Sequence, residues 1–139
     1  MATRIRDIMT GSPTAVSPEL DLVTVARAMR DEGIGAVLVS DGDDLMGLVT
    51  DRDLVVRGLA AGGDPGATRI GGLASSVTAT VGPDDPLEKA AQIMRERAVR
   101  RLPVLEDGRP VGIVSIGDLA IERDASATLA DISAARPNT

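Results

Sequence analysis

Two short elements of the sequence place a hydroxyl and a carboxylate three residues apart. In the first element Thr50 precedes Asp53, directly after an apolar run led by glycine. In the second, Ser115 precedes Asp118 in the same context. This spacing fits a capping box, in which the two residues satisfy free amide groups at the start of a helix. The same groups could bind a ligand, since a hydroxyl donates to a phosphate oxygen and a carboxylate accepts hydrogen bonds from a ribose diol. The two interpretations are compatible, because a capping residue can also line a site.

The two elements are copies of one another, because the chain contains an internal repeat. Residues 3–57 align without a gap to residues 68–122, and 14 of the 55 aligned pairs are identical. The carboxylates Asp53 and Asp118 are one of the identical pairs. One small unit has therefore been duplicated, and we expect the function to depend on both copies of the element.

The composition excludes most catalytic and metal chemistry. Hydrophobic residues make up 43% of the chain, but Phe, Tyr, Trp, His and Cys are all absent. The core must therefore be aliphatic. The chain has no imidazole base, no thiol nucleophile, no disulfide, and almost none of the donors of zinc, copper or haem sites. No base, nucleophile or metal cluster converges in the sequence, so we predict a protein that is not an enzyme and requires no cofactor.

The charge and the hydropathy pattern limit the kinds of partner that the chain can bind. The chain has 15 basic and 21 acidic residues, a net charge of −6, which argues against a nucleic-acid binder. The absence of aromatic rings also removes stacking platforms for single strands. No apolar run approaches the roughly 20 residues that span a bilayer, and the N-terminus shows no signal-peptide core. We therefore expect a cytoplasmic protein that binds neither nucleic acid nor membranes.

Each repeat is predicted to form a strand, a helix, two strands and a second helix. Apolar residues at helical spacing begin at Leu22 and again at Leu87, and Gly33 is predicted to end the first of these helices. Turn sequences at 41–44 and 106–109 lie between apolar runs, which predicts two hairpins. The predicted hairpin strands are 36–39 and 45–49 in the first repeat and 102–105 and 110–114 in the second, and the last helix of the first repeat is predicted at about 51–59.

The predicted organisation is α+β, with two β-α-β-β-α repeats. The first repeat covers 3–61, a linker covers 62–67, the second repeat covers 68–122, and a tail covers 123–139, with a further helix expected at about 126–134. One repeat is too small to bury both faces of its sheet, so we expect the repeats to pack sheet to sheet about a pseudo-twofold axis. Pro103 has no N–H, which predicts that its strand is an edge strand or leaves its first position unpaired.

The order of these residues resembles a tandem pair of CBS domains (cystathionine β-synthase domains) over residues 3–122. The resemblance is carried by Met-Thr, Val-x-Pro, Leu-x-x-Ala/Val-x-x-x-Met, Arg-Arg-Leu-Pro-Val and Gly-Ile-Val-Ser-x-x-Asp-Leu. Its most specific parts are 47–53 and 100–104. The stretches 34–36 and 50–62 are similar to small stand-alone bacterial pairs.

The resemblance implies two clefts between the repeats, each able to hold an adenosyl ligand such as AMP, ADP, ATP or S-adenosylmethionine. By position, Asp118 and Asp53 would hold the two ribose diols, and Ser115 and Thr50 would lie near ribose or phosphate. The adenine would contact the other repeat. For the Ser115/Asp118 cleft the implied contacts are Thr14, Ile34 and Gly35, with Ile113 as a floor; for the Thr50/Asp53 cleft they are Ala79, Val99 and Arg100, with Leu48 as a floor.

Four arginines form the densest basic cluster: Arg95, Arg97, Arg100 and Arg101. Arg95 and Arg97 suit a solvated helix end, where cations are favoured. Arg100 and Arg101 precede an apolar strand, and their counterparts in the first repeat are uncharged. In the family the position of Arg101 often faces ligand phosphates, which a guanidinium suits. We therefore expect the two clefts to differ in affinity.

These observations favour a non-catalytic regulatory module that binds adenosyl ligands and signals through a change in conformation or assembly. A homodimer is expected, because apolar helix faces of such pairs commonly continue across a twofold interface. The output would pass to a separate effector protein or to self-assembly. The alternative is a stress-related scaffold protein with no tight nucleotide ligand.

Overall fold

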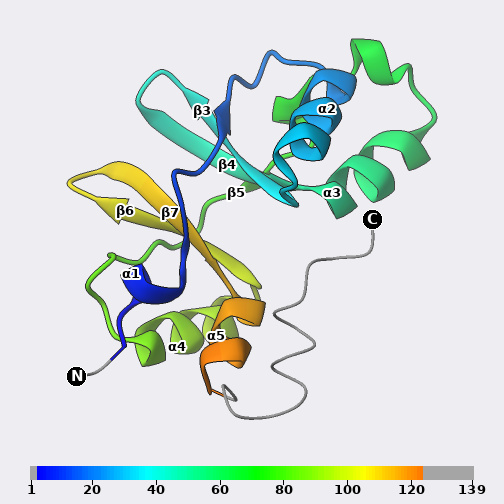
Figure 1. The fold of residues 1–139 in the computed structure, drawn as a ribbon. Coiled ribbons are helices and arrows are strands. Elements are labelled where there is room, and N and C mark those ends of the chain that lie inside the picture. The colour runs from blue at the N-terminus through cyan, green and yellow to red at the C-terminus, as the bar shows by residue number, and fades with distance from the viewer. Residues whose placement is uncertain (1–2, 124–139) are drawn as a thin grey trace. The chain divides into compact units, whose positions relative to one another are not determined.

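The structure is a computed structural model that describes residues 3–123 (Figure 1). It consists of two compact units. The first-repeat unit is Pro13–Val77, and the second-repeat unit combines the described residues up to Ser12 with those from Thr78 onward. Both units contain helices and a sheet, which confirms the predicted α+β class. The predicted sheet-to-sheet packing stays a prediction, and the helix expected at 126–134 lies outside the described residues.

The first-repeat unit is built on a sheet with strand order β2-β3-β4-β5. Helix α2 begins after Asp21, whose side chain accepts from the amide of Thr24, and ends at Gly33 in the left-handed conformation at φ 65°. The predicted end of this helix is confirmed. The elements of this sheet and its helix are β2 (Ala15–Val16), α2 (Leu22–Glu32), β3 (Ala36–Asp41), β4 (Asp44–Thr50) and β5 (Ser75–Ser76).

The helical segment after β4 is less regular than predicted. It begins as α3 (Asp51–Asp53), continues as the π-helical turn η1 (Leu54–Gly58), and ends as the 3-10 turn η2 (Leu59–Ala61). A Cβ atom at Gly58 would collide with the Leu22 side chain and lie tightly against the Leu73 side chain at 3.1 Å. Gly58 therefore packs closely against the core where the helix widens into the π turn. Local periodicity does not predict this contact, because its partners lie elsewhere in the sequence. Two further 3-10 turns follow, η3 (Pro65–Ala67) within the predicted linker and η4 (Ile70–Gly72).

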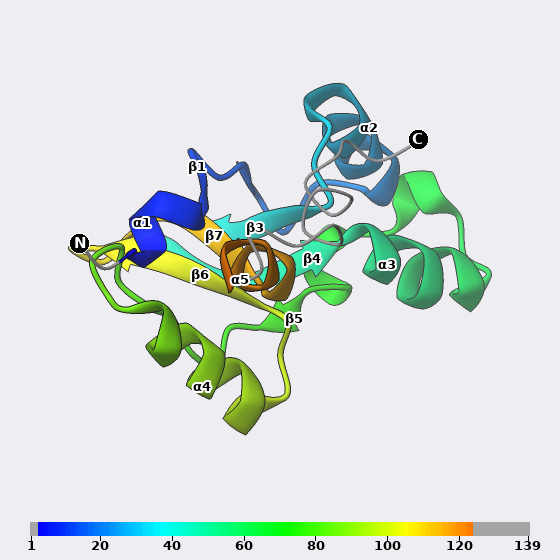
Figure 2. The ribbon, with the colours of Figure 1, turned by 60° about the horizontal axis from the view of Figure 1, so that its bottom comes forward.

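The second-repeat unit has a sheet of order β1-β7-β6, with α4 packed on one face of the β6–β7 hairpin (Figure 2). The strand with Pro103, β6, is last in this sheet order, as predicted, and Val81 adds an isolated parallel bridge to Val104 on its outer side. The carbonyl of Pro103 accepts from the amide of Val81 at 3.1 Å, on the side away from β7, so the missing N–H costs no bond to β7. The elements are α1 (Ile5–Ile8), β1 (Thr10–Gly11), α4 (Leu87–Arg97), β6 (Arg101–Glu106), β7 (Arg109–Ser115) and α5 (Ile116–Arg123).

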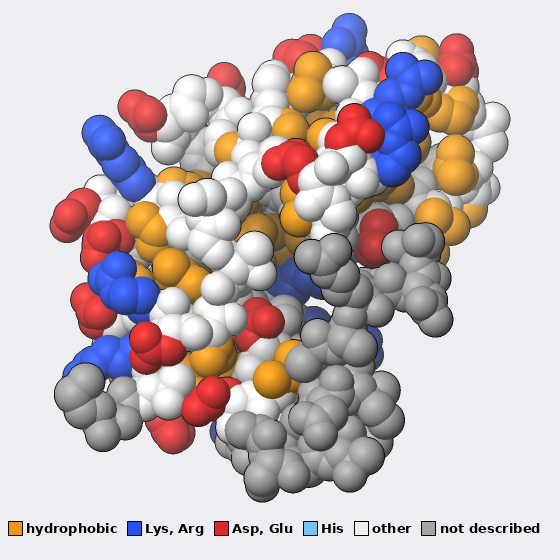
Figure 3. Space-filling view, in the orientation of Figure 1, with side chains coloured by type: hydrophobic (Ala, Val, Ile, Leu, Met, Phe, Trp, Pro, Cys, Tyr) orange, Lys and Arg blue, Asp and Glu red, His pale blue; other side chains and the backbone are white. Residues whose placement is uncertain are grey.

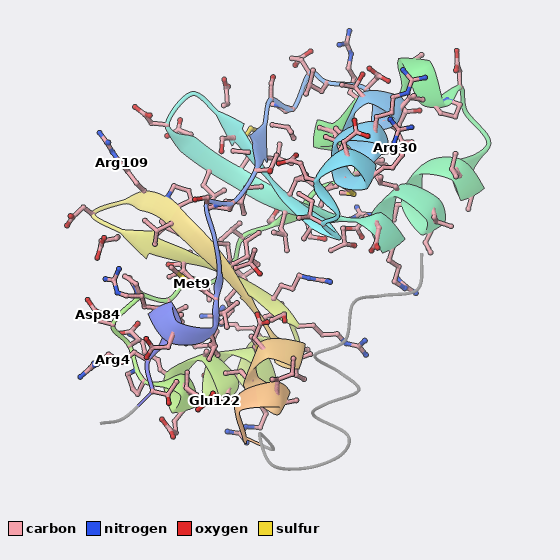
Figure 4. All side chains as sticks on the ribbon, viewed as in Figure 1. Arg4, Met9, Arg30, Asp84, Arg109 and Glu122 are labelled. Carbon is pink, nitrogen blue, oxygen red and sulfur yellow. The ribbon has the colours of Figure 1, made fainter. Side chains whose placement is uncertain are left out.

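The compact units do not coincide with the sequence repeats, because the first segments of the two repeats are exchanged. Ile5 of the first repeat is fully buried in the core of the second-repeat unit. Its counterpart Ile70 is fully buried in the core of the first-repeat unit. Arg4 and Asp84 lie together in the second-repeat unit (Figure 4), where the Arg4 guanidinium donates to the Asp84 carbonyl. Each repeat therefore supplies buried side chains to the core built mainly by the other: Ile5 comes from the first repeat, and Ile70 and Leu73 come from the second.

Candidate functional site

Both hydroxyl–carboxylate elements form complete capping boxes where a strand meets a helix. At the first, the amide of Asp53 donates to the Thr50 hydroxyl at 3.2 Å, and the amide of Thr50 donates to Asp53 Oδ2 at 2.9 Å. At the second, the amide of Asp118 donates to the Ser115 hydroxyl at 3.1 Å, and the amide of Ser115 donates to Asp118 Oδ2 at 2.8 Å. The capping interpretation is therefore confirmed at both places, here called the first and the second junction.

Capping leaves bonding capacity at each junction. Asp53 and Asp118 use only Oδ2, and their Oδ1 atoms have no hydrogen bond to any described residue. The hydroxyls of Thr50 and Ser115 accept a bond, so each keeps a proton to donate. All four residues are half-buried. Within residues 3–123, each junction therefore keeps one carboxylate oxygen and one hydroxyl proton available to a ligand, in positions that the cap fixes.

The first junction lies on the sheet face opposite the core. Thr50 pairs with Ala36 across β4 and β3, and the next pair on that face joins Leu48 to Leu38. Side chains alternate along a strand, so these residues point away from the face where Val49 is buried in the core. The predicted floor residue Leu48 is thus on the same face as Thr50.

The second junction has the same layout with one charged addition. Ser115 pairs with Arg101 across β7 and β6, and Ile113 pairs with Pro103 as the next pair on that face. The predicted floor residue Ile113 therefore shares a face with Ser115. Arg101 is half-buried, and Arg100 is exposed with its carbonyl accepting from the amide of Ile116 at 2.8 Å. The structure brings a predicted phosphate contact and a predicted hydroxyl together.

The model of the CBS domain matches the chain twice, at residues 5–58 and 70–123. The chain belongs to the CBS domain family. It is a CBS pair, and the two matched segments end just beyond the two junctions.

Known relatives agree with this assignment. The pair is 40% identical over 119 residues to Hypoxic response protein 1 of Mycobacterium tuberculosis, covering 85% of this chain and 83% of that protein. The crystal structure of Hypoxic Response Protein I with two coordinated zinc ions has a TM-score of 0.72 and covers 85% and 97% of the two chains at 40% identity. The CBS pair of protein MJ0100, in complex with 5'-methylthioadenosine and S-adenosyl-L-methionine, has a TM-score of 0.79 and covers 91% and 100% at 22% identity, a likeness of fold.

The composition of this chain bears on whether it could hold zinc. Zinc sites in proteins are built mainly from Cys and His, and this chain has neither. Over residues 3–123 no group of three or more acidic side chains is placed to hold a metal ion. Nor does any helix in that range have the length and apolar character needed to cross a membrane.

The remaining predicted contacts of the CBS pair are divided between its units. In the first-repeat unit, Thr14 donates its hydroxyl to Glu32 Oε1 at 2.7 Å, and the Gly35 carbonyl accepts from the amide of Asp51 at 3.0 Å. Gly35 therefore lies beside the first junction within its own unit. Three other predicted contacts are half-buried against the cores: Ile34 in the first-repeat unit, and Ala79 and Val99 in the second. Their predicted pairing with the junction of the other repeat stays a prediction.

Two features of the structure were not predicted from the sequence. One is the Arg101–Ser115 pair. Counting outward from the turn at 107–108 misses it by one residue, because a β-bulge shifts the register between Val104 and Leu105. The other is an apolar groove between α4 and α5, with a volume of about 470 Å³. Its lining residues are Ala91, Met94, Arg95, Val99, Ile116, Leu119 and Ala120. No single helix pattern signals the groove, because it exists only once two helices are placed side by side.

Proposed function

We propose that this CBS pair is a non-catalytic regulatory module that binds adenosyl ligands at its two junctions. The observation that carries the proposal concerns the Oδ1 atoms of Asp53 and Asp118. Neither atom has a hydrogen bond within the described part of the chain, and a capping box holds each carboxylate beside an apolar strand face. A carboxylate fixed in this way can accept hydrogen bonds from both hydroxyls of a ribose without moving. The cap thus preorganises the side chain that would recognise the sugar.

The chemistry around each carboxylate suits the rest of an adenosyl group. Thr50 and Ser115 can donate a hydroxyl proton to the ribose or to the group on its 5' carbon. Leu48 lies on the face of Thr50 and is half-buried, so it can offer apolar surface to the adenine ring; Ile113 lies on the face of Ser115 but is only 9% exposed. The CBS pair of protein MJ0100, which shares the fold, is in complex with two adenosyl compounds. That neighbour supports the ligand class proposed here.

The response to ligand is proposed to be a change in conformation or assembly of a homodimer. A ligand shifts such an equilibrium only by its difference in affinity for the two states. Large apolar side chains are available for an interface, since Val55, Val56 and Leu59 are about half exposed at 56%, 47% and 51%. Hydrophobic side chains are visible at the surface over this helical segment after β4 (Figure 3). The signal would then pass to a separate effector protein or to a larger assembly.

Equilibrium dialysis tests the ligand class directly. The chain has no aromatic residue, so absorbance at 260 nm reports the nucleotide with almost no protein background. AMP, adenosine and S-adenosylmethionine should each be tested up to millimolar concentration. We expect saturable binding that weakens in Asp53→Asn and Asp118→Asn, and that is unchanged in the matched control Asp43→Asn at an exposed turn. No saturable binding of any of the three would contradict the proposal and favour the scaffold alternative.

A further inference from the structure

The two junctions differ in charge. At the second junction Arg101, on the same face as Ser115, stands against the single carboxylate of Asp118, so these two charges balance. The corresponding positions of the first junction are 36 and 53, and they contribute only the carboxylate of Asp53. The residues between each hydroxyl and its carboxylate add Asp51 and Arg52 at the first junction and no charge at the second. The first junction therefore has one arginine against two aspartates, a net charge of −1.

The strand register places one of these charged residues, Arg101, on the same sheet face as the Ser115 hydroxyl. Arg101 and Ser115 are direct cross-strand partners, so their Cβ atoms are about 5 Å apart and their side chains share a face. Among residues 3–123 no carboxylate lies within ion-pair distance of the Arg101 guanidinium. The partner of Thr50 at the same position of the first junction is Ala36. The side chain of Arg101, which has no ion pair within residues 3–123, therefore starts next to the Ser115 hydroxyl, whereas the Thr50 hydroxyl has an alanine in that place.

The first junction also holds a carboxylate where the second has an apolar residue. Asp51 occupies the position of Ile116, and its amide is bonded to the carbonyl of Gly35. A Cβ atom at Gly35 would lie 3.4 Å from Asp51 Oδ2, so the glycine leaves this carboxylate close to the start of β3. An anionic ligand group at the first junction would face both Asp51 and Asp53.

We propose that the two junctions sort adenosyl ligands by charge. This inference rests on the proposed function. The second junction takes ligands that carry phosphate, since a guanidinium binds phosphate oxygens with charge-assisted hydrogen bonds. The first junction takes adenosyl compounds without negative charge on the 5' substituent, because two carboxylates repel a phosphate there. The pair would then compare the level of a phosphorylated nucleotide with that of a neutral or cationic adenosyl compound.

The test compares AMP with adenosine, which differ only in the phosphate. A hydrogen bond to a charged group contributes about 1.5–3 kcal/mol, which corresponds to about 10- to 100-fold in Kd. Arg101→Ala should therefore weaken AMP binding about 10- to 100-fold and change adenosine binding less than about threefold. The reciprocal variant Ala36→Arg should strengthen AMP binding at the first junction. Raising the salt concentration from 0.05 to 0.5 M (roughly a threefold shorter screening length) should weaken AMP binding and leave adenosine binding unchanged.

Variants of the two carboxylates show which junction binds AMP, and melting temperatures show whether each variant is folded. We expect Asp118→Asn to remove the tighter AMP site and Asp53→Asn to leave it in place. Each variant should melt within a few degrees of the parent protein. Equal weakening of AMP and adenosine by Arg101→Ala, or loss of the tighter AMP site in Asp53→Asn, would overturn the charge sorting while leaving the proposed function standing. Failure of both compounds to bind would overturn both.

Discussion

The ends of the two long helices offer a matched test of how backbone conformation limits stability. Helix α2 ends at Gly33 with φ 65° and ψ 39°, and helix α4 ends at Ala98 with φ 55° and ψ 42°. Both residues are left-handed and exposed, at equivalent positions of the duplicated unit. The left-handed conformation costs an alanine about 1–2 kcal/mol, whereas glycine adopts it freely. The extra chain entropy of glycine in the unfolded state offsets about 0.4–1 kcal/mol of that cost.

We therefore expect Ala98→Gly to raise the free energy of unfolding by about 0.5–1 kcal/mol. For a chain of this length the melting temperature should rise by about 2–5 °C. Gly33→Ala should lower stability by a similar amount. A Cβ atom at Gly33 would have no heavy atom within 4 Å, so the loss would be conformational rather than steric. The double variant should fall within about 0.5 kcal/mol of the parent, because the two sites belong to different units and add independently.

Chemical denaturation followed by circular dichroism measures these differences. Gly72→Ala is the control, since a Cβ atom there also meets nothing within 4 Å and Gly72 is not among the positive-φ glycines. This control should be neutral or slightly stabilising. If Ala98→Gly destabilises the protein, or if Gly33→Ala does no more than the Gly72 control, the assignment of strain to the left-handed positions is wrong.

Three further predictions concern the core, the acid limit and metal ions. Ile5→Ala should cost about 2–5 kcal/mol in denaturant unfolding, because Ile5 is fully buried in the second-repeat core; a loss below 1 kcal/mol would contradict the exchanged arrangement. Hydrogen bonds from Thr24 lower the pKa of the Asp21 carboxyl. The contribution of this carboxylate to stability is therefore present above the unfolded pKa of about 4 and is lost as pH falls through the folded pKa. From pH 5 to pH 2 the melting temperature should drop less in Asp21→Asn than in the parent protein. Zinc or a chelator should leave the melting temperature unchanged, since the chain lacks His and Cys, and a zinc-dependent rise would refute this.

Local patterns predicted the secondary structure well where the decisive contacts are close in sequence. The capping boxes follow from a spacing of three residues at a strand-to-helix boundary, which is why both were found. The end of α2 at Gly33 and the edge position of the Pro103 strand follow equally from single-residue backbone chemistry. The helix after β4 was predicted as regular, and its π turn was missed. Gly58 meets Leu22 and Leu73 there, residues that are distant in sequence.

The sequence by itself determined the duplication, the two hydroxyl–carboxylate elements and the chemistry that the chain lacks, because each depends on residue identity and short spacing. Only the tertiary structure decided which core each isoleucine enters. Ile5 and Ile70 occupy equivalent positions, so no local pattern distinguishes a segment that packs in its own unit from one that is exchanged. The placement of Arg101 beside Ser115 likewise depends on strand register, since a slip of one residue would turn the guanidinium to the opposite face. Residue type supplied the groups that could recognise a ligand, and non-local pairing decided which of them share a site.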